Sequence, residues 1–121
     1  MADLQMGEIE ARFADIIWQN EPISSTELAK RGEESFKWKK TTSFTVLKRL
    51  CDKGLFQNRK GTVTSLISHD EFYSMRSEKF IEEAFHGSLP AFLAAFTARK
   101  PLTPEEAAHL RRMVADYKEE N

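Results

Sequence analysis

The chain has 121 residues, 40% of them hydrophobic and 31% charged, with a formal net charge of -1 at pH 7. This length predicts one domain, or one small domain with an appended dimerisation segment, and excludes two full domains. No apolar run approaches the roughly 18 residues that cross a bilayer, no stretch resembles a secretion signal, and the single cysteine, Cys51, excludes an internal disulfide. We therefore expect a cytoplasmic protein with no structural metal and no cofactor.

Apolar residues near the N-terminus recur at helical spacing and predict a helix over residues 8–20. They are Ile9, Phe13, Ile16 and Ile17. Pro22 then breaks this helix.

The capping pattern of Ser24 and Glu27 predicts a second, short helix over residues 25–32. We expect residues 33–37 to form a polar connector that Trp38 anchors to the core.

A third helix is predicted over residues 39–53, ended by Gly54. At 100° per residue, one side of it is apolar and is expected to face inward, with Val46, Leu47 and Leu50. The opposite side is polar and carries Thr41, Thr45, Lys48, Arg49 and Asp52, with Thr42 and Phe44 at the margins. Phe44 either packs under the connector as part of the core, the interpretation we prefer, or contacts a thymine methyl group.

Residues 55–68 are rich in β-branched and apolar side chains around Lys60-Gly61, which predicts a β-hairpin. Three more helices are expected after it. A capping pattern at Ser68 opens one over residues 69–86, Ser88 opens a short one, and Thr103 opens the last.

Three helices followed by a hairpin, with the third helix basic, is the element order of a winged helix-turn-helix. The sequence therefore predicts a mainly α fold with two parts. Residues 1–68 would form a winged-helix DNA-binding domain with a small β-hairpin wing, and residues 69–121 a helical dimerisation region.

Charge is unevenly distributed along the chain. Residues 37–60 hold eight Lys or Arg and one acid, Asp52, so the rest of the chain is acidic. Such a basic segment is typical of proteins that bind a polyanion, although a solvated helix face plus a basic hairpin would have the same composition.

Each basic or hydroxyl side chain of this segment has an expected role on DNA. Lysines at the start of the third helix would hold a phosphate together with the first-turn amides, while Thr41, Thr45 and Arg49 would read base edges. Arg59 and Lys60, at the hairpin tip, would reach an adjacent phosphate or the minor groove. The predicted DNA-binding residues are Lys39, Lys40, Thr41, Thr42, Thr45, Lys48, Arg49, Arg59 and Lys60.

The C-terminal helices carry more large apolar residues than some fifty residues can enclose, which predicts a homodimer. The predicted dimerisation residues are Phe80, Phe85, Phe92, Leu93, Phe96, Leu110, Met113, Val114 and Tyr117. The alternative is that some of them form one compact monomeric core. A two-fold axis would place two recognition helices about one DNA turn apart, or a multiple of it, matching an inverted repeat.

The pattern W-x-x-x-T-x-x-T-x-L-x-R-L-x-x-K-G resembles the bacterial penicillinase and methicillin-resistance repressors, the BlaI/MecI family. Its residues here are Trp38, Thr42, Thr45, Leu47, Arg49, Leu50, Lys53 and Gly54. Ile-Ile-Trp at 16–18 and the stretches FHGSLPAFLAAF and LTPEEAAHLRRMV extend the resemblance over nearly the whole chain. It implies a homodimeric repressor of a resistance or sensor operon, and no enzymatic activity.

The chain also departs from the family pattern. Lys39-Lys40 replaces a frequent Ser-Pro, and Ser43 replaces an apolar residue, which suggests a different operator sequence. In antibiotic-responsive members a relay from a membrane sensor metalloprotease leads to cleavage of an Asn-Phe bond, and the matching positions here are Ala95 and Phe96. The cysteine cluster of the copper-responsive branch is missing.

Other residue patterns carry weaker signals. Three scattered histidines suggest surface or capping roles, Cys51 suggests a small core residue with a redox switch as the alternative, and no catalytic set can be assembled. The rival function is a winged-helix protein-interaction module that dimerises without sequence-specific DNA binding.

Overall fold

The structure is a computed structural model that describes residues 3–118. They form two compact units that divide after Ser77, inside helix α4 (His69–Phe85) and not at its start. None of the helices in the described range is long and apolar enough to span a membrane.

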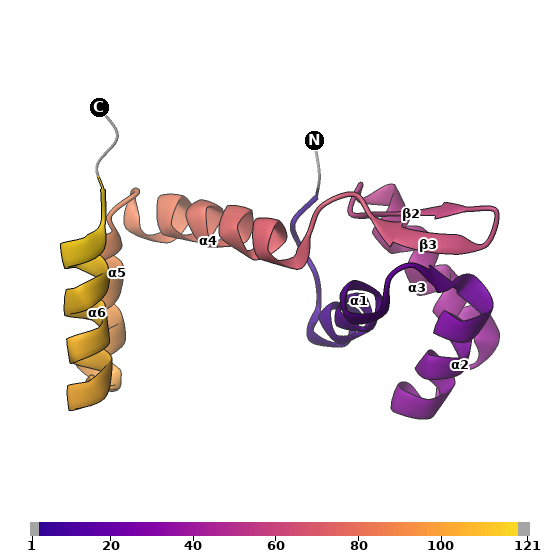
Figure 1. The fold of residues 1–121 in the computed structure, drawn as a ribbon, viewed down its shortest axis with the longest axis horizontal. Helices are drawn as coiled ribbons and strands as arrows, with labels where there is room; N and C mark the ends of the chain where they lie inside the picture. Colours follow the sequence, from indigo (N-terminus) through magenta and orange to yellow (C-terminus); the bar gives the residue numbers. More distant parts are fainter. Residues whose placement is uncertain (1–2, 119–121) are drawn as a thin grey trace. The chain divides into compact units, whose positions relative to one another are not determined.

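The first unit combines three helices with a small antiparallel sheet (Figure 1). Its elements are α1 (Glu8–Asn20), β1 (Ile23–Ser24), α2 (Ser25–Phe36), α3 (Lys40–Asp52), β2 (Phe56–Arg59) and β3 (Thr62–Ser65). The strand order is β1-β3-β2, with Arg59 opposite Thr62 at the closed end of the hairpin. This order of elements confirms the predicted mainly helical fold with a hairpin wing.

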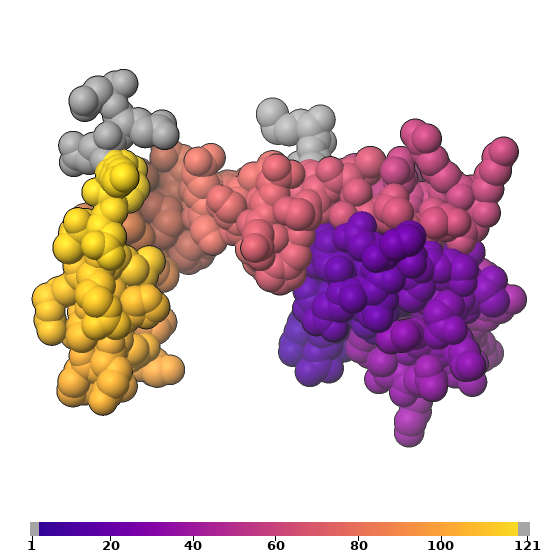
Figure 2. Space-filling view, in the orientation of Figure 1, coloured from indigo at the N-terminus to yellow at the C-terminus, as the bar shows by residue number. Residues whose placement is uncertain are grey.

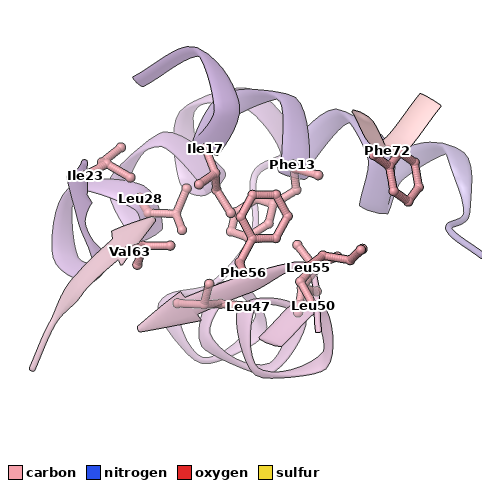
Figure 3. Close-up of a cluster of buried hydrophobic side chains, with 12 residues drawn as sticks. Phe13, Ile17, Ile23, Leu28, Leu47, Leu50, Leu55, Phe56, Val63 and Phe72 are labelled. Carbon is pink, nitrogen blue, oxygen red and sulfur yellow. The ribbon is translucent and has the colours of Figure 1, made fainter. Parts of the chain in front are cut away.

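The core of the first unit lies between the helices and the sheet (Figure 3). Its largest fully buried side chains are Phe13, Ile17, Leu28, Leu50, Leu55, Phe56, Val63 and Phe72. They come from α1, α2, α3, the turn before β2, both wing strands and the start of α4. Because burial of each such side chain contributes about 1.5 to 3 kcal/mol, this cluster fixes how α3 and the wing sit on the unit.

The predicted end of the second helix at Gly32 is wrong, because α2 continues to Phe36. Gly32 is buried inside the helix, and a Cβ added to it would lie 2.3 Å from Ser43 Oγ. The glycine therefore permits close packing of α2 on α3. The helix ends instead where Lys37 adopts a left-handed φ of 58° and donates its N–H to Glu33 O.

The turn between α2 and α3 is fixed by aromatic packing. The Trp38 ring lies 5.2 Å from that of Phe13 and 4.8 Å from that of Phe36, measured between centroids. Trp38 thus anchors the turn to the core, as expected.

The second unit contains the end of α4 with α5 (Leu89–Arg99) and α6 (Pro104–Asp116). The helices α5 and α6 run side by side (Figure 1), and residues of both line a pocket of about 310 Å³. The predicted caps are present: Ser88 Oγ accepts the Ala91 N–H, and Thr103 and Glu106 form a reciprocal capping box. The hydrogen bond that the Glu106 carboxylate accepts from the Thr103 backbone N–H holds the pKa of Glu106 below its ordinary value.

A cluster of phenylalanines joins the helices of the second unit. Phe80, Phe85 and Phe92 have ring centroids 5.7 to 6.2 Å apart in pairs, and Phe96 lies 6.1 Å from Phe92. Yet no residue from 78 to 118 is buried in the single chain. This unit therefore lacks the enclosed core that the first unit has.

Candidate nucleic-acid interface

Helix α3 separates its residues cleanly between a buried and an exposed side. Ser43, Val46, Leu47 and Leu50 are buried, whereas Thr41, Thr42, Phe44, Thr45, Lys48, Arg49 and Asp52 are exposed. The core therefore holds the helix by one side and leaves a polar and cationic side facing solvent.

The preferred expectation for Phe44, packing in the core, is wrong. The residue is 36% exposed, and the Lys40 Nζ lies 5.7 Å from the centre of its ring. Ser43, which faces Gly32, occupies the inward position instead. Phe44 lines an open pocket of about 260 Å³ together with Leu47, Lys48, Cys51 and Asn58.

Cys51 is half-buried and packs against the core. Burial raises the pKa of its thiol, and the nearby Asp52 carboxylate acts in the same direction. A raised pKa leaves the thiol protonated and unreactive at neutral pH, as befits a small packing residue.

The N-terminus of α3 is cationic and accessible. Lys39 is the N-cap with extended backbone, and the N–H groups of Thr42 and Ser43 donate to its carbonyl at 3.0 and 3.2 Å. No side chain within residues 3–118 caps this end, and Lys39 and Lys40 are both exposed. The partial positive charge of the helix end and two ammonium groups thus share one side of the unit.

Two residues of the exposed side make contacts within α3. Thr45 Oγ1 donates to Thr41 O at 2.9 Å, so its hydroxyl can still accept a hydrogen bond while its proton is used. Lys48 Nζ lies 3.2 Å from Asp52 Oδ2, and both side chains are largely exposed. Since exposed ion pairs contribute only about 0 to 1 kcal/mol, a phosphate can replace Asp52 as the partner of Lys48.

Arg49 has a partner that the sequence did not reveal. Its Nη1 lies 3.4 Å from Glu10 Oε2 on α1, and the other carboxylate oxygen, Glu10 Oε1, accepts from Lys53 Nζ. The Glu10 side chain is only 10% exposed, whereas that of Arg49 is 56% exposed. In the sequence Glu10 is one acid among several in the first helix, and nothing in its spacing connects it to residues about forty positions away.

The wing carries the remaining predicted residues on a tight turn. Lys60 and Gly61 both have positive φ, 52° and 88°, which is the conformation of a two-residue hairpin turn. Asn58 Oδ1 accepts the Gly61 N–H at 3.0 Å, and Arg59 Nε donates to Gln57 Oε1 at 3.2 Å. Side chains of the hairpin project from the surface of the unit in the space-filling view (Figure 2).

The structure thus brings Lys39, Lys40, Thr41, Thr42, Thr45, Lys48 and Arg49 onto the exposed part of one helix, with Arg59 and Lys60 on the wing of the same unit. In the second unit, Ala95 and Phe96 are both exposed on α5. Among the described residues no group of three or more His, Cys, Asp or Glu is arranged to hold a metal ion.

Three helices with an antiparallel wing define the first unit as a winged helix-turn-helix. The family model described as penicillinase repressor matches residues 6–116, and the chain belongs to this family.

Comparison with individual proteins agrees with this assignment. The chain is 25% identical over 118 residues to the penicillinase repressor of Bacillus licheniformis, covering 94% of this chain and 92% of that protein. It is 22% identical over 114 residues to the methicillin resistance regulatory protein MecI of Staphylococcus aureus (strain Mu50), covering 91% and 93%. The solution structure of the DNA-binding domain of the repressor BlaI matches with a TM-score of 0.53 and 25% identity, over 59% of this chain and 93% of that domain.

Proposed function

We propose that the protein is a homodimeric transcriptional repressor that binds an inverted-repeat operator through α3 in the major groove and through the basic wing. Membership of a repressor family and the likeness of its first unit to a repressor's DNA-binding domain support the DNA-binding repressor. The observation that carries the mode of binding is the exposed side of α3, which presents hydroxyls and cations while the opposite side is buried.

The side chains of α3 divide by chemistry into two roles. Lys39, Lys40 and the first-turn amides suit a phosphate, which fixes register without reading sequence. Thr41 and Thr45 offer methyl groups and hydroxyl oxygens to base edges. The exposed ring of Phe44 adds an apolar surface for a thymine methyl group.

The second unit supports the dimer. Phe80, Phe96, Met113, Val114 and Tyr117 are between 44% and 77% exposed in the single chain, far above what stable core residues show. Covering such surface across a two-fold axis would offset the entropic cost of association. The same axis would present two copies of α3 to an inverted repeat.

Release from DNA by cleavage between Ala95 and Phe96, downstream of a membrane sensor metalloprotease, stays a prediction from the family resemblance. Both residues are exposed, but they lie within α5, so a protease would first have to unwind that part of the helix.

The function is tested by measuring binding of the full chain to an operator that it selects from a pool of random duplexes, and to a shuffled duplex, at several salt concentrations. We expect a preference for the selected duplex and a steep loss of affinity with salt. The double substitution Lys39→Ala and Lys40→Ala should lower affinity for both duplexes and reduce the salt slope by up to about 2. Thr41→Val should lower affinity for the selected duplex alone. Lys79→Ala, an exposed lysine of α4, is the control.

Equal binding of the wild type to selected and shuffled duplexes would contradict sequence-specific repression. That result would favour the rival function, a winged-helix module that dimerises and contacts an acidic protein.

A further inference from the structure

Glu10 occupies a position that links α1 to the exposed side of α3. Its carboxylate accepts from Arg49 Nη1 at 3.4 Å through one oxygen and from Lys53 Nζ through the other. A carboxylate that is 10% exposed thus carries two cationic partners.

The two partners are held very differently. The Lys53 side chain is 16% exposed and also donates to Gln5 O, so it is fixed among the N-terminal residues and the end of α3. The Arg49 side chain is 56% exposed and contacts Glu10 through one nitrogen at the long end of hydrogen-bond distance. Arg49 is therefore the exchangeable partner.

Departure of Arg49 would not leave an uncompensated buried charge. Lys53 remains on Glu10 as a counter-ion, so the large penalty for orphaning a buried carboxylate is avoided. When an anion approaches the exposed side of α3, the Arg49 guanidinium can leave Glu10 and form an ion pair with that anion. Planar, multidentate donors of this kind bind phosphate and guanine edges well once the geometry is fixed.

Resting on the proposed function, we infer that Glu10 is an internal anion that competes with DNA for Arg49 and thereby limits affinity for the operator and its preference over unmatched DNA. In a loose complex with unmatched DNA, the lysines still contact phosphates, but no phosphate or base edge is fixed beside Arg49, and Arg49 stays on Glu10. In the fitted complex with the operator, a fixed phosphate or base edge makes a charge-assisted contact that displaces Glu10. The operator complex carries the full cost of separating Arg49 from Glu10, whereas the loose complex forgoes only a weaker Arg49 contact. Glu10 therefore lowers affinity for the operator more than affinity for unmatched DNA.

The test compares wild type with Glu10→Gln, which keeps the shape of the side chain and removes its charge. On the selected operator we expect affinity to rise by about 3- to 10-fold with the salt slope unchanged, because Arg49 contacts this DNA in both proteins. On shuffled DNA affinity rises less, and the salt slope steepens by up to about 0.9, the value for one added phosphate contact, so the ratio of operator affinity to shuffled affinity rises. In the background of Arg49→Ala, Glu10→Gln should have no effect on either duplex.

Glu27→Gln is the matched control, because it removes a carboxylate from a different arginine, Arg31, which lies 3.3 Å away on α2. Urea unfolding followed by the fluorescence of Trp18 and Trp38 separates a change in stability from a change in binding. The inference is overturned if Glu10→Gln acts like Glu27→Gln, or acts equally with and without Arg49, while wild type still prefers the operator. If wild type shows no preference, the proposed function itself fails.

Discussion

Two small residues control how α3 lies against α2. Gly32 faces Ser43, and there is no room between them for a Cβ unless the serine hydroxyl moves. Ser43 Oγ is itself buried and has no hydrogen-bond partner among the described residues. A buried hydroxyl without a partner costs about 1 to 3 kcal/mol.

Ser43→Ala should therefore raise the free energy of unfolding by about 1 kcal/mol, since it removes the unpaired hydroxyl and keeps the Cβ. Gly32→Ala should add about 1 kcal/mol more in the Ser43→Ala background, because alanine is the better helix former and the clashing atom is gone. In the wild-type background the gain should be smaller. Urea unfolding of the four proteins, read by tryptophan fluorescence, gives the coupling energy, and equal effects in both backgrounds would contradict this packing.

The same pair shows where residue-level prediction stops. A glycine late in a helical pattern can end the helix or admit a neighbouring helix, and only the partner distinguishes the two. Gly54, with φ of 81°, has the first role and was predicted correctly, whereas Gly32 has the second. Glu10 was missed for a similar reason, since its partners lie in another helix.

At the scale of elements, the wing turn places a lysine where asparagine or glycine is favoured. Lys60 has a φ of 52°, a left-handed conformation that costs roughly 1 kcal/mol or more for most side chains. Under the proposed function, the charge of Lys60 at the hairpin tip would contact a phosphate, which would account for a lysine at this position.

Lys60→Asn should accordingly stabilise the first unit by about 0.5 to 1 kcal/mol and weaken binding to selected and shuffled DNA by a similar factor, because a phosphate contact is lost. Lys37→Asn is a suitable control, since Lys37 has a comparable φ of 58° at the end of α2 but is not among the proposed contacts. It should be stabilising with a smaller loss of affinity. Thermal unfolding measures the change in stability, and fluorescence anisotropy measures the change in DNA affinity. If Lys60→Asn leaves the affinity unchanged, the hairpin tip is not part of the interface.

Helices and hairpin were predictable because periodicity, caps and turn residues are local signals. The starts of α2, α4, α5 and α6 follow from their capping residues, and the hairpin from Lys60-Gly61. The strand β1 was not predicted. It has only two residues, and its partners in β3 lie about forty positions along the chain, so no local pattern marks it.

At the scale of the whole molecule, the two units differ in how far they enclose their apolar residues. The first has a core of fully buried side chains, whereas no residue from 78 to 118 is buried. The sequence could predict an excess of apolar residues here, but not which of them a single chain leaves uncovered. The structure shows Val114 at 77% and Tyr117 at 72% exposure as the extreme cases.

Val114→Glu should raise the dissociation constant of the dimer by at least about 10-fold, because a charge would have to be buried in the interface, while the first unit stays folded. Ala115→Glu adds the same charge one position along α6, outside the proposed contact set, and should have a smaller effect. Light scattering across a concentration series measures the mass. A wild-type mass of one chain at high concentration would exclude the dimer.

The strand β1 ties the wing to the helix-turn-helix. Ile23 pairs with Val63, and the first residue of α2, Ser25, donates its N–H to Gly61 O at 2.8 Å, at the very turn of the hairpin. These contacts hold the hairpin near its turn, so the hairpin loses little conformational entropy when it binds a ligand. Substitutions in the short link between α1 and α2 should therefore change the orientation of the hairpin, even though that link contains no lysine or arginine.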